Sequence, residues 1–188
     1  MTEADATPVT LDVRRLPTTE LLVLYGRLLD ELNDRKAVRS RNAPACDLAE
    51  TLSALAYDAE LAPKSEKAWD VRDRGGRRIQ VKARVLNAEN RRGNYSVFRS
   101  KDGFECCVFV LLEAADYSVA SAVEVPADVV LDKASAVPWV NGSRIRVRTD
   151  LAALPRAIDM TSRFRDAMRV IDAATADRPV ALRQAPAR

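Results

Sequence analysis

The sequence predicts one α/β (α+β) domain in which a central mixed β-sheet is flanked by helices. Three observations predict this fold class. Apolar residues recur at helical spacing near both ends of the chain, they alternate with polar residues in the middle, and one central run is almost wholly apolar. A length of 188 residues suits a single domain with a sizeable core. We expect the domain to span 17–175, with flexible tails at 1–16 and 176–188.

The composition excludes several classes of function. There is no apolar run of about 18 residues, and the first residues have neither the basic nor the apolar region of a signal peptide, so we expect a cytoplasmic protein without a membrane span. The cysteines, Cys46, Cys106 and Cys107, include no CxxC pair, which argues against disulfides and structural zinc. The chain has no histidine, so Ser-His-Asp and Cys-His catalysis are excluded. An active site must therefore use carboxylates, amides, hydroxyls, lysines and arginines.

Apolar spacing predicts three helices. The first spans about 18–35, and its apolar positions are Leu21, Leu24, Tyr25, Leu28, Leu29 and Leu32. The second runs from about Cys46 to Tyr57, with a buried stripe of Leu48, Leu52, Leu55 and Ala56. The third covers about 162–175 and carries Phe164, Met168, Val170 and Ile171. We expect these apolar positions to face the core.

The middle of the chain is predicted to form strands. The segments "AWDVRD" and "RRIQVKARV" flank Gly75-Gly76, which predicts a β-hairpin. The run "FECCVFVLLE" fits a central strand buried on both faces, so Cys106 and Cys107 are expected to be buried. "SVASAVEVP" predicts a further strand, "ADVVLDKA" a short helix or turn, and "SRIRVRT" a short strand. Trp69 and Trp139 are predicted to be core residues.

Polar side chains gather around the hairpin. Asp70 precedes Gln80 by ten residues, so it is expected to lie opposite or diagonal to Gln80 on the other arm. Gln80 and Lys82 share one strand face, because side chains two residues apart point the same way. These three side chains are therefore expected to converge on one spot. Glu50 lies away from the apolar stripe of its helix, and it joins them if that helix packs across the hairpin.

Asp70, then Gln80-Val81-Lys82 on the next strand, with Glu50 on a preceding helix, resembles the PD-(D/E)XK superfamily of restriction-endonuclease-like nucleases. The Gln-x-Lys form resembles the variant of Mrr-type restriction nucleases. The segments "RNAPACDLAE", "SEKAWDV", "RIQVKAR" and "LLEAADYSV" are similar to an uncharacterised bacterial family of that fold, and the resemblance covers roughly residues 20–130. It implies a restriction-endonuclease-like fold, metal-dependent cleavage of DNA in restriction or phage defence, and a homodimer as a common assembly.

The resemblance also implies roles for these residues. Asp70 and Glu50 would supply carboxylates to Mg²⁺ or Mn²⁺, with the Gln80 side-chain oxygen and the Val81 carbonyl as further ligands. The metal would activate water and offset charge at the phosphate, and Lys82 would orient that water. The sequence departs from the usual pattern at Gln80, which is uncharged, so the site has one anion fewer. The alternative is therefore a catalytically idle nuclease fold that binds nucleic acid or protein.

Basic residues flank this constellation. A net charge of +3 does not by itself predict a nucleic-acid partner, so the argument rests on local clusters. We expect contacts with DNA phosphates from Arg39, Arg41, Lys67, Arg91, Arg92, Arg99 and Lys101. Tyr95 or Phe98 would stack on an exposed base, or Phe98 would instead anchor the core. Two further alternatives stay open: the polar face of 78–85 is simply solvated, and residues 65–67 either line the pocket or are ordinary loop residues.

Overall fold

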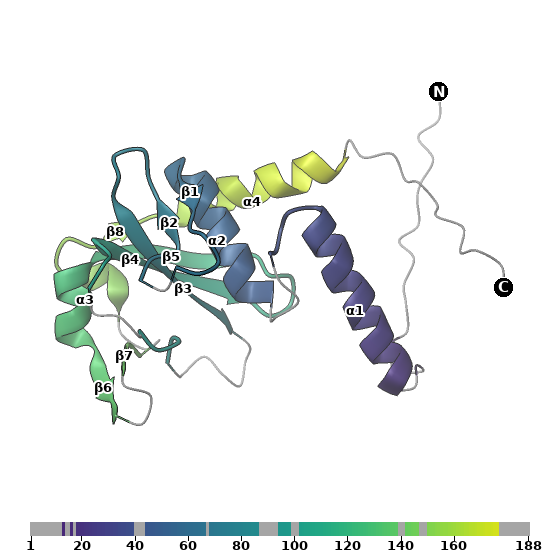
Figure 1. Cartoon of the computed structure of the whole chain (residues 1–188), viewed down its shortest axis with the longest axis horizontal. Coiled ribbons are helices and arrows are strands. Elements are labelled where there is room, and N and C mark those ends of the chain that lie inside the picture. Colours follow the sequence, from purple (N-terminus) through teal and green to yellow (C-terminus); the bar gives the residue numbers. More distant parts are fainter. Residues whose placement is uncertain are drawn as a thin grey trace.

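A mixed six-stranded sheet with helices on both faces forms the centre of the protein (Figure 1). The computed structural model describes residues 13, 16, 18–39, 44–66, 68–86, 94–98, 102–138, 142–146 and 150–176. Its helices are α1 (Thr18–Asp34), α2 (Pro44–Tyr57), α3 (Ala127–Lys133) and α4 (Thr161–Ala176). Its strands are β1 (Glu60–Leu61), β2 (Val71–Arg72), β3 (Arg78–Leu86), β4 (Cys106–Glu113), β5 (Val119–Pro126), β6 (Ser135–Val137), β7 (Gly142–Arg144) and β8 (Ile158–Asp159). The predicted α/β class with a mixed sheet is confirmed.

The strands of the main sheet are arranged in the order β1-β2-β3-β4-β5-β8. β3 and β4 run parallel, and every other neighbouring pair is antiparallel. β2 and β3 form the predicted hairpin, in which Gly76 has a φ of 83°, a left-handed conformation that glycine adopts without a steric penalty. β6 and β7 form a separate two-stranded ribbon.

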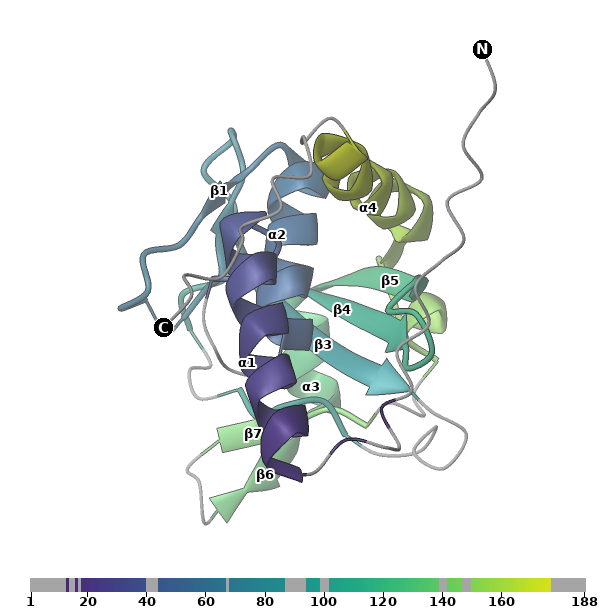
Figure 2. The same ribbon diagram turned by 90° about the vertical axis from the view of Figure 1, so that its right-hand side faces the viewer.

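Alternate residues of the central strands enter two separate cores. Val81 of β3 and its neighbour Val108 of β4 pack beneath α2 and α4 (Figure 2). Phe109, on the opposite face of β4, packs with α3 and the segment 94–98. β4 is therefore buried on both faces, as its almost wholly apolar sequence predicts. Cys106 and Cys107 are buried in this strand, also as predicted.

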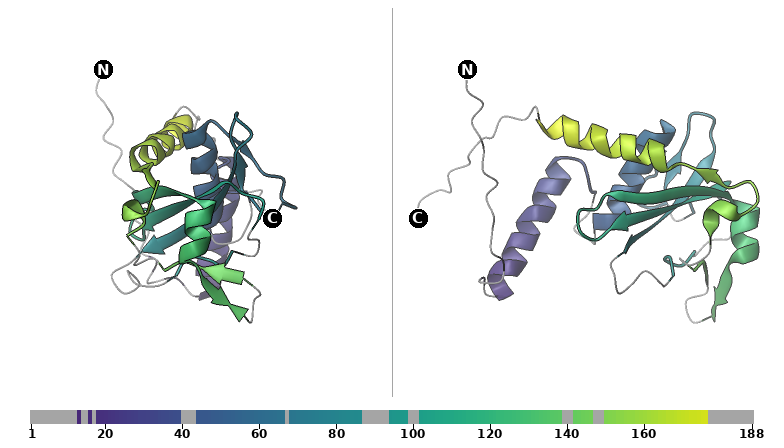
Figure 3. Two further views of the ribbon diagram at one scale, coloured as in Figure 1. Left: turned by 90° about the vertical axis from the view of Figure 1, so that its left-hand side faces the viewer. Right: turned by 180° about the vertical axis from the view of Figure 1, so that it is seen from behind.

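α1 stands away from the sheet, and only part of its apolar surface is covered (Figure 3). Leu29 is 3% exposed, whereas Leu28 is 54% exposed, and Val23 and Tyr25 are exposed as well. The prediction that the apolar positions of this helix all face the core is therefore wrong. Apolar residues occupy more than one side of α1, and the described part of the protein covers one side alone.

Two further apolar residues that we expected in the core are exposed. Leu55 of α2 and Val170 of α4 lie outside the arcs of their helices that face the sheet. Sequence spacing places a residue on a helix, but the neighbouring elements decide how wide the buried arc is. The remaining stripes are covered: Leu48 and Leu52 are buried, and so is Phe164.

Several short strands are not predicted from the sequence. β1, β6 and β8 have two or three residues each, and β7 covers only the start of the predicted strand "SRIRVRT". The expected tails at 1–16 and 176–188 lie almost entirely outside the described residues. Within the described ranges, no helix combines the length and the apolar character that crossing a membrane requires.

Candidate functional site

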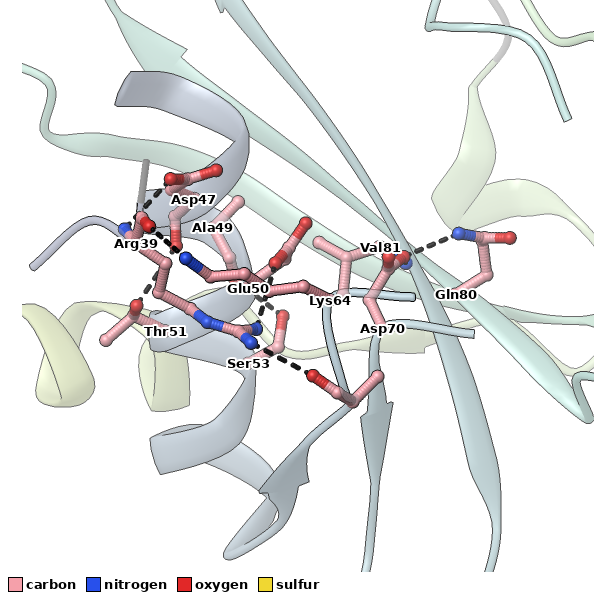
Figure 4. Close-up of polar contacts among 11 residues, drawn as sticks. Arg39, Asp47, Ala49, Glu50, Thr51, Ser53, Lys64, Asp70, Gln80 and Val81 are labelled. Atoms are coloured by element: carbon pink, nitrogen blue, oxygen red, sulfur yellow. Dashed lines mark hydrogen bonds and ion pairs between the residues drawn. The ribbon is translucent and has the colours of Figure 1, made fainter. Parts of the chain in front are cut away.

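The register of the hairpin brings Asp70 against Gln80 and Val81. Val71 pairs with Ile79, which places Asp70 across the hairpin from Gln80. The Gln80 amide donates to Asp70 Oδ2 at 2.5 Å, and the Val81 backbone N–H donates to the same oxygen at 2.6 Å (Figure 4). Asp70 and Gln80 are thus in direct contact, which is the arrangement that the hairpin pattern predicts.

Among the described residues, hydrogen-bond donors contact only one carboxylate oxygen of Asp70. Both donors bond Oδ2, and among the described residues none donates to Oδ1. Burial raises the pKa of Asp70, while the Val81 N–H, the charge of Lys82 and the Gln80 amide lower it in part. Asp70 is therefore a carboxylate that is held in place through one oxygen and has the other left for a ligand.

Glu50 and Asp70 line the same cavity. α2 packs across β3, as the convergence of these residues requires, and Glu50 follows Ala49, which is buried in that interface. The cavity has a volume of about 270 Å³, and its lining residues are Arg39, Glu50, Ala62, Pro63, Lys64, Glu66, Trp69 and Asp70. Acidic and basic side chains therefore face one space between α2 and the segment that joins β1 to β2.

The charge of Asp70 disfavours ionisation of Glu50. Burial, followed by the charge of Asp70, raises the pKa of Glu50 to about 7, and Arg39 and Lys82 oppose this rise. Carboxylates that share a partly buried space are stabilised in their ionised form when a cation enters between them. The ionised form of Glu50 therefore depends on the positive charges near it, which include Arg39 and Lys82.

The donor set fits a hard divalent cation that keeps part of its water shell. Within the described ranges, no three Asp, Glu, His or Cys side chains form a group that could hold a metal ion. Mg²⁺ is nevertheless commonly bound through one or two carboxylates, with water and substrate phosphate completing its shell. Asp70 Oδ1 and the carboxylate of Glu50 match that requirement.

Gln80 and Lys82 are buried on the opposite face of β3 from α2. Gln80 is 5% exposed and Lys82 is 8% exposed, so the alternative of a solvated strand face is wrong. The segment 94–98 covers this face: Lys82 Nζ lies 4.9 Å from the centre of the Phe98 ring and 3.5 Å from the Val97 carbonyl oxygen. Gln80 bonds Asp70 directly, and the positive charge of Lys82 lowers the pKa of Asp70 and of Glu50. The Lys82 ammonium group itself lies beside Phe98, and neither Gln80 nor Lys82 lines the cavity.

The groups that we expected to bind the metal from Gln80 and Val81 are oriented differently. The Gln80 side chain turns its amide nitrogen toward Asp70, and its oxygen points away (Figure 4). Val81 contributes its N–H to Asp70. Both residues therefore act in this structure as donors that hold Asp70. Their predicted role as oxygen ligands stays a prediction.

Arg39 lies inside the cavity and not on an outer surface. Its Nη2 donates to the Ala62 carbonyl at 3.0 Å, and its Nη1 lies 3.6 Å from Glu50 Oε2. Its backbone N–H donates to Asp47 Oδ2 at 2.8 Å, and its carbonyl accepts from Lys64 Nζ at 3.0 Å. The other basic residues predicted to contact DNA, which are Arg41, Lys67, Arg91, Arg92, Arg99 and Lys101, lie outside the described residues.

The aromatic residues separate into core and cavity. Tyr95 and Phe98 are buried and pack against Phe109, so the expectation that either stacks on an exposed base is wrong, and Phe98 is a core anchor. Trp69, which we expected in the core, is half-buried: it packs against the core that contains Phe98 and Phe109, and it also lines the cavity beside Asp70. Trp139 lies outside the described residues.

Sequence reasoning missed part of the lining. Lys64 was not expected there, and residues 65–67 were expected either to line the pocket or to be loop residues. Glu66 lines the cavity, and its Oε1 also accepts the Ala68 N–H at 2.8 Å. The position of Trp69 directly before Asp70 was an available signal, because a residue next to a candidate ligand in the chain is close to the same space.

No protein-family model matches this chain, and no curated protein matches it either. The resemblance to the PD-(D/E)XK superfamily therefore rests on the residues quoted above and on the arrangement of Asp70, Gln80 and Glu50.

Proposed function

We propose that this protein is a metal-dependent nuclease-like enzyme that hydrolyses phosphodiester bonds in DNA. The observation that carries the proposal is the shared cavity of Asp70 and Glu50, in which Asp70 Oδ1 has no protein donor among the described residues. Arg39 and Lys64 line the same cavity, so cationic groups for a phosphate lie next to carboxylates for a metal. A restriction-endonuclease-like fold, a role in restriction or phage defence, and a homodimer belong to the same proposal through the resemblance.

The chemistry assigns a task to each side chain. Asp70 and Glu50 would hold Mg²⁺ or Mn²⁺, which, when bound, lowers the pKa of water and offsets charge on the phosphate. A water oxygen attacks phosphorus, one phosphorus–oxygen ester bond breaks, and the leaving oxygen takes up a proton. Gln80 and Val81 hold Asp70 in position through their hydrogen bonds to its Oδ2. Lys82, beside Phe98, places a positive charge close enough to lower the pKa of both carboxylates.

A second candidate function is a catalytically idle nuclease fold that binds nucleic acid. Two observations favour it. Gln80 satisfies Asp70 with a hydrogen bond where the family pattern has an acid, and the Lys82 ammonium is engaged by Phe98 and Val97. Such a module would bind DNA in a salt-dependent way without cutting it.

A plasmid cleavage assay with Mg²⁺, Mn²⁺ or a chelator separates the two functions. The enzyme is expected to nick or cut the plasmid only with metal, and Asp70→Asn, which keeps the shape and can still accept both hydrogen bonds, should reduce the rate by about 100-fold or more. Asp58→Asn is the matched control, because Asp58 is an exposed carboxylate in a surface pair with Arg74. Cleavage that persists in Asp70→Asn would refute the assignment, and DNA binding without cleavage in the wild type would favour the idle module.

A further inference from the structure

Arg39 connects three parts of the chain at the cavity. It follows α1, its backbone N–H is bonded to Asp47 of α2, and its guanidinium donates to the carbonyl of Ala62 beyond β1. The side chains of Arg39 and Glu50 are 26% and 25% exposed, so their contact is only partly screened by water. Figure 4 shows the Arg39 guanidinium reaching toward Glu50.

The two contacts of the guanidinium differ in kind. The bond to the Ala62 carbonyl is 3.0 Å long, within the ordinary range for a hydrogen bond. The approach to Glu50 is 3.6 Å and involves one nitrogen and one oxygen, unlike the short bidentate pairs that arginine forms with carboxylates. The hydrogen bond to the Ala62 carbonyl therefore positions the Arg39 guanidinium, whose charge offsets that of Glu50 without a short bidentate pair.

We propose that Arg39 is the resident counter-cation of Glu50, that a divalent cation competes with it for that carboxylate, and that the released guanidinium binds a substrate phosphate. This inference rests on the proposed metal-dependent function. A cation held by Asp70 and Glu50 would lie within a few ångströms of the guanidinium and repel it. Phosphate is the anion that arginine's planar fork matches best, and Lys64, bonded to the Arg39 carbonyl, adds a second positive charge at the same place.

The inference predicts opposite effects of one substitution on two ligands. In Arg39→Gln the backbone bond to Asp47 can stay, but the charge facing Glu50 is gone. Mn²⁺ should therefore bind about fivefold more tightly than to the wild type, because its competitor has been removed. In the wild type, Mn²⁺ should increase the affinity for a short DNA duplex. The variant should lack this increase, so in Mn²⁺ it should bind the duplex about tenfold more weakly than the wild type. A purely structural arginine would not tighten binding of a metal.

Calorimetric titration measures the affinity for Mn²⁺. The fluorescence anisotropy of a labelled short duplex, with and without Mn²⁺, measures the affinity for DNA, and a gel run afterwards shows whether the duplex is still intact. Arg35→Gln is the matched control, because Arg35 is exposed and pairs with Glu31 on α1, away from the cavity. It should leave both affinities within about twofold of the wild type. Arg39→Lys keeps the charge, so it should bind Mn²⁺ like the wild type while losing part of the duplex affinity.

The outcomes distinguish the inference from the function on which it rests. If the wild type binds Mn²⁺ through Asp70 but Arg39→Gln binds it equally or more weakly, the counter-cation inference is overturned and the proposed function stands. If Arg39→Gln does not fold, an Arg39→Lys variant whose Mn²⁺ affinity differs from the wild type by about fivefold overturns it equally. If the wild type binds no Mn²⁺ even with the duplex present, both are overturned.

Discussion

Gln80 decides how Asp70 is held when no cation is bound. An acid at this position would place a second carboxylate against Asp70 Oδ2, whereas the amide donates a hydrogen bond of 2.5 Å to that oxygen. The uncharged side chain therefore stabilises the folded protein without metal, and it does so at the expense of one anionic ligand. Gln80, which contacts Asp70 directly, is therefore also the position at which the sequence departs from the PD-(D/E)XK pattern.

Gln80→Glu should weaken the fold and strengthen the metal site. Without metal, we expect the free energy of unfolding to fall by about 2 kcal/mol at neutral pH, because a hydrogen bond becomes a carboxylate–carboxylate repulsion. Added Mn²⁺ should restore most of that loss. Urea unfolding with and without Mn²⁺ measures both effects. A variant as stable as the wild type in a chelator would contradict this view of Gln80.

The raised pKa of Glu50 makes stability depend on pH. Its folded-state pKa of about 7 lies above its ordinary value of 4.5, so the folded protein binds more protons than the unfolded chain between these values. Stability therefore falls as pH rises through this window, and Glu50→Gln removes that loss. Relative to the wild type, the variant should gain on the order of 2 kcal/mol between about pH 5 and pH 8. An equal difference at both pH values, measured by urea unfolding, would count against the burial of Glu50.

Metal binding should follow the opposite trend with pH. The cation needs ionised Glu50, and protons compete with it below the pKa of about 7. Affinity for Mn²⁺ should therefore rise by about tenfold between roughly pH 6 and pH 8, with release of protons. Calorimetry in two buffers of different ionisation heat measures the proton release. An affinity that does not change over this range would exclude Glu50 as a ligand.

At the scale of elements, the hairpin is fixed to the sheet at its turn as well as at Asp70. Arg77 donates to Asp73 within the turn and reaches Glu124 of β5, where Nη1 lies 2.6 Å from Oε1. Glu124 is buried, and Arg77 forms an ion pair with it. This pair helps to hold the register that brings Asp70 opposite Gln80.

Arg77→Met should therefore be costly. It leaves the buried Glu124 without its partner, and we expect a loss of about 3 kcal/mol in the free energy of unfolding. Arg74→Met is the control, because Arg74 pairs with Asp58 at the surface and both side chains are exposed; its effect should stay within about 0.5 kcal/mol. If chemical denaturation gives similar values for the two variants, the buried pair does not secure the hairpin.

Two neighbouring leucines of α1 test whether only one side of this helix is covered. Leu28 and Leu29 are neighbours of identical chemistry, but one is exposed and the other buried. Leu29→Ala should destabilise the protein by about 2–4 kcal/mol, and Leu28→Ala by less than about 1 kcal/mol. Denaturant unfolding of both variants decides this. Equal losses would show that α1 is covered on both sides in solution.

For the whole molecule, the sequence predicts those features that depend on residues close together in the chain. Period-two alternation around Gly75-Gly76 predicts the hairpin, and the ten-residue separation of Asp70 and Gln80 predicts their contact, because both are set within one hairpin. The apolar run of β4 predicts its burial on both faces. The long, strongly periodic helices α1, α2 and α4 are likewise predicted close to their observed bounds.

The rest depends on contacts between distant segments. β1 and β8 have two residues each, too few to show any periodicity. In the sequence, Arg39 is one of several basic residues in a connector. It lies near Glu50 because that connector packs on α2. Lys82 alternates correctly with its neighbours, but the covering segment 94–98 decides that its ammonium lies beside Phe98. Exposure along α1 depends on what covers each side, which helical spacing does not encode.

Calorimetric titration with Mn²⁺, on the wild type and on Asp70→Asn, each alone and with a short DNA duplex, tests whether Asp70 and Glu50 form a metal site. We expect one Mn²⁺ site per chain in the wild type, with tighter binding when the duplex is present because its phosphate completes the coordination shell. Asp70→Asn should lose about 100-fold in Mn²⁺ affinity. Equal Mn²⁺ binding by the two proteins, or no binding by either even with the duplex, would contradict the assignment of Asp70 and Glu50 as a metal site.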